Sequence, residues 1–145
     1  MIRSSLESFV ETVTTAGEIT LADVRRLQRD ILPHGPDDRD EADILIALDR
    51  AVAAKHCSWN AFVISTIVDY VVWTARPTGY VDRDAALWLV ASLGAGRGPT
   101  PVAEAIAFEV AREAERADQA LVAFVMRSAA ARRQGLADMA AAHQG

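Results

Sequence analysis

The sequence contains one cysteine, and this scarcity already limits the kind of protein it encodes. The single Cys57 excludes an intramolecular disulfide, which fits folding in a reducing compartment. Residues 1–7 include no apolar stretch of the kind found in a secretory signal. The longest apolar stretch, residues 59–73, is shorter than the ~20 residues that cross a bilayer, and it contains Asp69. We therefore expect a cytoplasmic protein without an integral membrane segment.

Helix breakers are also few, with five prolines and eight glycines among 145 residues. A hydrophobic fraction of 51% with 24% charged residues is typical of a folded globular chain, and residues 1–145 are most simply one domain. The net charge of −5 argues against nucleic acid as the main partner. We interpret two arginine clusters as solvated helix faces: Arg25, Arg26 and Arg29, and Arg127, Arg132 and Arg133.

Apolar residues recur at helical spacing along the chain, and no segment shows the alternation of a strand. The sequence therefore predicts an all-α bundle of about seven helices. Capping residues predict where the helices start: Ser4-x-x-Glu7, Thr20-x-x-Asp23, Asp38-x-x-Glu41, Ser58, Asp82 and Thr100-Pro101. We expect the third helix to run to about residue 54 and the sixth to residue 117. Residues 135–145 have little to bury and are expected to fray.

The chain also contains a pattern that occurs twice. Gly17 is followed by Glu18-Ile19 and a helix start, and Gly79 is followed by Tyr80-Val81 and another. We call the difference in residue number between these two glycines the repeat offset. The same offset separates Phe62 from Phe124, which stand in matching apolar segments, and Gly35 and Gly98 are separated by one position more. We interpret this as an internal duplication, with repeats at about residues 17–73 and 79–133 that stack into one core.

The turns after these glycines have the spacing of a degenerate EF-hand loop, with an acidic or small residue six positions after the glycine. Only the loop around Gly35 keeps both end acids, Asp30 and Glu41, and it places Leu32 where calcium needs an oxygen ligand. Turn and N-cap chemistry therefore explains the spacing better than calcium binding does. We assign no metal ligands.

This skeleton resembles the tellurite-resistance TerB-like helical domains and their uncharacterised bacterial relatives. The resemblance covers roughly residues 4–133. It rests on three segments: Gly17-Glu18-Ile19, Gly35 followed by Asp40-Glu41-Ala42, and Gly79-Tyr80-Val81-Asp82. The family implies a cytoplasmic helical bundle, tied to stress response or membrane-adjacent complexes, with acidic loops proposed to hold metal. Only one turn here is acidic, through Asp37, Asp38, Asp40 and Glu41, so no metal role is carried over.

Two further places contain residues that could carry chemistry. His56-Cys57 precedes a helix N-terminus, a position at which reactive thiols are found in proteins. Adjacent side chains rarely point at each other, so we expect a buried Cys57 beside a surface histidine. Asp69 interrupts an apolar helix, and we expect it to link the two halves through Tyr80, a loop amide or an arginine. Asn60, Ser65 and Thr66 would share that polar seam, and we assign Trp59, Phe62, Trp73 and Trp88 to the core.

These observations leave three functional hypotheses. The first is a non-enzymatic interaction or adaptor domain with a protein partner, because no phosphate loop, nucleophile elbow or His/Cys metal spacing is present. The second is a metal- or small-ligand-responsive sensor that uses the acidic turn 37–41. The third is an enzyme built around Asp69 or Cys57. We assign no catalytic or cofactor-binding residues, and homo-oligomerisation stays open.

Overall fold

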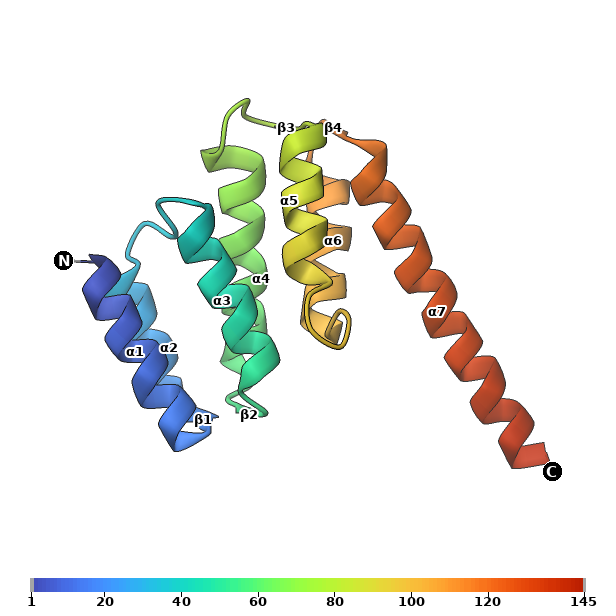
Figure 1. Ribbon diagram of the computed structural model, residues 1–145, viewed down its shortest axis with the longest axis horizontal. Coiled ribbons are helices and arrows are strands. Elements are labelled where there is room, and N and C mark those ends of the chain that lie inside the picture. The colour runs from blue at the N-terminus through green and yellow to red at the C-terminus, as the bar shows by residue number, and fades with distance from the viewer. Residues whose placement is uncertain (1, 145) are drawn as a thin grey trace.

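The computed structural model describes residues 2–144, and the side chains of residues 4–142. These residues form an all-α bundle with two pairs of very short strands (Figure 1). In chain order the elements are α1 (Ile2–Ala16), β1 (Glu18–Ile19), α2 (Leu21–Arg26) with a π-helical turn η1 (Leu27–Ile31), α3 (Arg39–Ala51), β2 (Ala54–Lys55), α4 (Ser58–Asp69) with a π-helical turn η2 (Tyr70–Thr74), β3 (Tyr80–Val81), α5 (Arg83–Leu93), α6 (Pro101–Glu113), β4 (Arg116–Ala117) and α7 (Gln119–Gln144).

Four helices begin at the predicted capping residues. Thr20 Oγ1 accepts the Asp23 amide at 3.2 Å, and the Asp23 carboxylate accepts the Thr20 amide at 2.9 Å, which confirms the capping box of α2. Asp38, Asp82 and Thr100 each accept the amide three residues on, at the start of α3, α5 and α6. Each cap satisfies an amide that has no partner within the helix.

Two predicted helix starts are wrong. Helix α1 begins at Ile2, so Ser4 lies inside its first turn and does not cap it. Helix α4 begins at Ser58 itself, and the residue before it, Cys57, makes no side-chain capping bond. The acceptor at this end is the ring of His56, whose Nδ1 lies 3.1 Å from the Ser58 amide nitrogen. A histidine two residues upstream is not part of the usual capping signature, so the pattern missed it.

The strands shorten two of the predicted helices. β1 pairs in parallel with β2, and β3 pairs in parallel with β4. Because residues 54–55 and 116–117 are extended, α3 ends at Ala51 and α6 at Glu113, earlier than we predicted. A two-residue strand is too short to show an alternating pattern, which is why the sequence did not reveal it.

The repeat offset separates the two strand pairs at every position. Glu18 aligns with Ala54, and Tyr80 aligns with Arg116. The His56 amide donates to the Ile19 carbonyl at 2.8 Å, and the amide of Asp118 donates to the carbonyl of Val81 at 2.8 Å. The turns before β1 and β3 both contain a glycine in the left-handed region, Gly17 at φ 73° and Gly79 at φ 83°. Glycine adopts this conformation without the penalty that a Cβ would bring.

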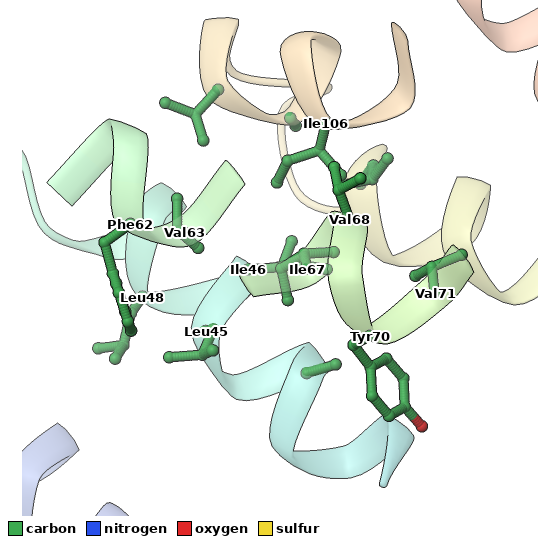
Figure 2. Packing of buried hydrophobic residues seen from close by; sticks show 14 of the residues in the cluster. Leu45, Ile46, Leu48, Phe62, Val63, Ile67, Val68, Tyr70, Val71 and Ile106 are labelled. Carbon is green, nitrogen blue, oxygen red and sulfur yellow. The ribbon is translucent and has the colours of Figure 1, made fainter. Parts of the chain in front are cut away.

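Helix α4 lies at the centre of the core and contacts α2, α3 and α6 (Figure 1). This position explains why it is the most apolar helix of the chain. Figure 2 shows Ile67 and Val68 of α4 with Ile46 of α3 and Ile106 of α6 around them. Phe62 is buried, as we predicted, and so is Phe124.

One residue assigned to the core lies outside it. Trp73 is 44% exposed, because the η2 turn carries it past the buried part of α4, and its indole donates to Glu113 at 2.7 Å. Trp59 is fully buried, and Trp88 is partly buried against the core.

Helix α7 runs along α5 and α6 and then leaves the body of the molecule (Figure 1). Residues 135–144, which we expected to fray, continue this helix, and the side chains of residues 131–142 are all exposed. The expected fraying of Gly145 lies outside the described residues.

Candidate functional site

The carboxylate that joins the two halves is Asp49, not Asp69. Asp49 lies on α3 and is only 5% exposed. Its Oδ2 accepts the Thr100 hydroxyl at 2.7 Å, and its Oδ1 accepts the Trp59 indole N–H at 3.0 Å. The Lys55 ammonium lies 3.6 Å from Oδ1 and donates to the carbonyls of Asp49 and Val52. This buried charge is therefore paired and hydrogen-bonded, as burial in a low dielectric demands.

Other polar bonds between α3 and α5 reinforce the joint. The Trp88 indole donates to Asp43 at 3.0 Å. Arg39 pairs with Asp84 at 2.9 Å, and its guanidinium lies 5.2 Å from the centre of the Trp88 ring. The structure thus places two polar clusters between the halves, one around Asp49 and one around Trp88.

Asp69 is exposed, so our prediction that it links the halves is wrong. It follows the buried Val68 on α4, and helical rotation turns it outward. No hydrogen bond or ion pair joins Asp69 to another described residue. The sequence correctly indicates a polar position at Asp69, but its pattern does not show which face of the helix other helices cover.

Asp69 does line a groove of about 340 Å³, which we call the first-half groove. Ser65 and Thr66, which we placed in the same polar seam, line it too, whereas Asn60 does not. The rest of its wall comes from η1, the turn after it, α4 and η2: Gln28, Leu32, Pro33, His34, Gly35, Pro36, Phe62, Tyr70 and Thr74. Burial raises the pKa of the Tyr70 phenol, with smaller contributions from the carboxylates of Asp38, Asp43 and Glu41 and an opposing one from Arg39.

A second groove has a volume of about 630 Å³, and we call it the second-half groove. Its walls are the end of α5, the loop that connects α5 to α6, the start of α6, and α7. Its lining residues are Val90, Ala91, Gly94, Arg97, Gly98, Pro99, Glu104, Phe124, Arg127, Ser128 and Ala131. Most of these follow a residue of the first-half groove by the repeat offset, as Phe124 follows Phe62. We did not single out this groove from the sequence.

The acidic turn 37–41 is used to start α3. Asp38 Oδ1 accepts the Glu41 amide at 2.9 Å, and Glu41 Oε1 accepts the Asp37 amide at 2.8 Å. Glu41 is buried, so its carboxylate points into this turn rather than toward solvent. Among residues 2–144, no group of three or more His, Cys, Asp or Glu side chains is placed to hold a metal ion.

The His56-Cys57 pair differs from our prediction in two ways. Cys57 is exposed rather than buried, and its Sγ lies 3.9 Å from His56 Nδ1. The same Nδ1 lies 3.1 Å from the Ser58 amide nitrogen and 2.8 Å from the Ser58 hydroxyl. A ring nitrogen that accepts the backbone amide has its lone pair occupied, so the arrangement serves the start of α4 better than it serves deprotonation of the thiol.

Several exposed apolar side chains lie on α6 and α7. Phe108 of α6 is 53% exposed and lines a hollow of about 220 Å³ together with Val125 and Ala129 of α7. Val122 and Met126 of α7 are also exposed. We call Phe108, Val122, Val125, Met126 and Ala129 the α6/α7 face.

The corresponding face in the first half is covered. Ile46, which precedes Phe108 by the repeat offset, is only 3% exposed. Val63 and Ile67, which precede Val125 and Ala129 by the same offset, are fully buried. Helices α5 and α6 lie over α3 and α4 there (Figures 1 and 2). No described element covers the α6/α7 face in the same way.

None of the described helices has both the length and the hydropathy needed to cross a bilayer. Comparison of the chain with protein-family models, with curated proteins and with solved structures finds no match.

Proposed function

We propose that this chain is a non-enzymatic protein-interaction domain, an adaptor, and that it binds a helical segment of its partner on the α6/α7 face. The observation that carries the proposal is the exposure of Phe108 at a position where the first half buries Ile46. Exposed apolar side chains gathered over two helices are typical of a docking surface. Lone exposed residues elsewhere on the molecule do not need such an explanation.

The covered face of the first half indicates what kind of partner fits. Two helices, α5 and α6, lie over α3 and α4, so helical packing is the solution that this chain itself uses. At the rim of the α6/α7 face, Arg132 pairs with Glu104 at 2.7 Å and Arg112 pairs with Glu109. Because these rim charges are already paired, we expect a partner helix to dock with an apolar stripe rather than with a charged one.

The constant repeat offset between matching features supports a second proposal, that the chain arose by an internal duplication. The repeat offset separates the two strand pairs, the two glycine turns and the caps Thr20 and Asp82. Such a duplication accounts for an open face at the end of the second half, because each repeat has a side that the next one would cover. The TerB-like family stays our proposed family, on the glycine turns of the sequence.

A selection experiment tests the adaptor proposal. A displayed library of helical peptides is passed over the immobilised domain, and the enriched peptides are tested against Phe108→Asp and against a control, Leu87→Asp. Leu87 is an exposed apolar residue of α5, 47% exposed, that lies outside the α6/α7 face. We expect amphipathic peptides whose binding is lost with Phe108→Asp and kept with Leu87→Asp. Enrichment of no peptide, or equal loss with both variants, would contradict the proposal.

A further inference from the structure

The two grooves occupy matching places but present opposite chemistry. Each has a buried phenylalanine in its wall, Phe62 in one and Phe124 in the other, and each has a hydroxyl residue four positions later, Thr66 and Ser128. The remaining wall residues differ in charge and in size.

The first difference is charge. Where the first-half groove has Gly35 and Ser65, the second-half groove has Arg97 and Arg127 at the positions given by the repeat offset. Neither guanidinium forms an ion pair with a described residue, and both are exposed. Two cations from different elements, a loop and a helix, therefore face one groove.

The second difference is space and polarity. Leu32 is replaced by Gly94 and Asp69 by Ala131, so the second-half groove has smaller side chains at these two places and no carboxylate at the second of them. The groove is correspondingly larger, about 630 Å³ against about 340 Å³. A Cβ placed on Gly94 would lie 3.6 Å from the Phe124 ring, which shows how closely that ring approaches the open wall.

One acidic residue also lines the groove, and it is already neutralised. Glu104 pairs with Arg132 at 2.7 Å, and Arg132 reaches it from α7. The charges that remain for a ligand are therefore those of Arg97 and Arg127, both positive.

The loop that carries Arg97 is held at both ends. Thr100 donates to the buried Asp49 at 2.7 Å and caps α6. Gly96 lies against the Arg50 side chain so closely that a Cβ there would come within 2.9 Å of Arg50 Cδ, and Arg50 donates to the Ser92 carbonyl at 3.3 Å. A loop fixed in this way lowers the backbone ordering cost of presenting the Arg97 cation to a ligand.

We propose that the second-half groove binds a small amphiphilic carboxylate, with its apolar body against Phe124, Val90 and Ala131 and its head group between Arg97 and Arg127. The volume, the apolar wall and the paired cations together define this ligand class. A ligand that has only an apolar chain, or only a carboxylate, makes only part of these contacts. The apolar side chains of the α6/α7 face do not line this groove, although Glu104 and Ser128 border both places.

Binding of three probes tests the proposal. Decanoate, below its micelle concentration, has both the chain and the charge; decanol has the chain alone, and acetate has the charge alone. We expect decanoate to shift backbone amide resonances of Gly94, Arg97, Phe124 and Ser128 in a saturable way. Decanol and acetate should bind at least about tenfold more weakly, since each loses one class of contact. Higher salt should weaken decanoate binding, because both guanidinium groups are exposed.

Variants then locate the site. Arg97→Gln and Arg127→Gln should each weaken decanoate binding about fivefold, the size expected for one exposed charge pair. Arg133→Gln removes the same charge from α7 without touching the groove, and Ser65→Gln alters the matching place in the first-half groove. Both controls, and Phe108→Asp, should leave the affinity within about twofold.

Three results would overturn the proposal. One is equal binding of decanol and decanoate, which would mean that the arginines do not contribute. Another is equal weakening by Arg133→Gln and Arg127→Gln, which would indicate nonspecific attraction to the helix. The third is a shift pattern centred on the first-half groove or absent from both. Melting temperatures close to that of the parent chain confirm that each variant is folded.

Discussion

Replacing Asp49 with alanine should destabilise the protein more than any change at Asp69. The substitution leaves the fully buried Trp59 indole N–H without an acceptor, and an unpaired buried donor costs about 1–3 kcal/mol. It also removes the acceptor of the Thr100 hydroxyl and the carboxylate beside the Lys55 ammonium. Breaking a fully buried charged pair from one side costs about 3–5 kcal/mol. Because the Lys55 side chain is 19% exposed and keeps two backbone carbonyl acceptors, its share is smaller, and we expect a total loss of about 3–4 kcal/mol for Asp49→Ala.

Urea unfolding followed by tryptophan fluorescence measures this loss. Asp49→Asn keeps one oxygen acceptor for the indole and should lose less, about 1–2 kcal/mol. Asp69→Asn, at an exposed position, should change the free energy of unfolding by less than about 0.5 kcal/mol. A loss below about 1 kcal/mol for Asp49→Ala, or a larger loss for Asp69→Asn, would refute the reasoning that this network joins the halves.

Three further predictions concern the core, pH and calcium. Phe62→Ala should cost about 3–5 kcal/mol in urea unfolding, because the ring is buried, and a loss below about 1 kcal/mol would place its helix on the surface. Burial raises the pKa of the Tyr70 phenol in the folded state. The stability that the neutral phenol contributes is therefore present below about pH 10 and is lost as pH rises through the folded-state pKa. Tyr70→Phe should remove this part of the decline in the free energy of unfolding between about pH 9 and 11. Calcium at 1 mM should not raise the melting temperature, whereas a site with a dissociation constant near 10 μM would add about 2.7 kcal/mol, roughly 5–10 °C. A rise of that size, absent in Glu41→Ala, would restore the metal-sensor hypothesis.

The sequence allowed the helices and most of their starts to be predicted, because capping depends on residues three positions apart. Asp38, Asp82 and Thr100 act locally, and their residue types are enough to identify them. The strands could not be found in this way. Each is only two residues long, and its partner is distant in sequence, as Glu18 and Ala54 show.

The candidate sites were harder to predict, because they depend on which helix faces become covered. Asp69 and Asp49 both stand among apolar residues, yet only Asp49 faces the Trp59 indole and the cap of α6. Trp73 continues an apolar run, but the η2 turn brings it to the surface. The exposure of Phe108 likewise depends on the end of the second half being open, which no local pattern records.

The most direct test of the interaction hypothesis is where a selected helical peptide binds. Backbone amide shifts recorded during titration with the peptide of highest affinity give this location on the folded chain. The account predicts that the largest shifts occur at Phe108, Val125 and Ala129. Largest shifts around Asp69 in the first-half groove, with Phe108 unchanged, would contradict it and would favour a ligand-binding or enzymatic site there.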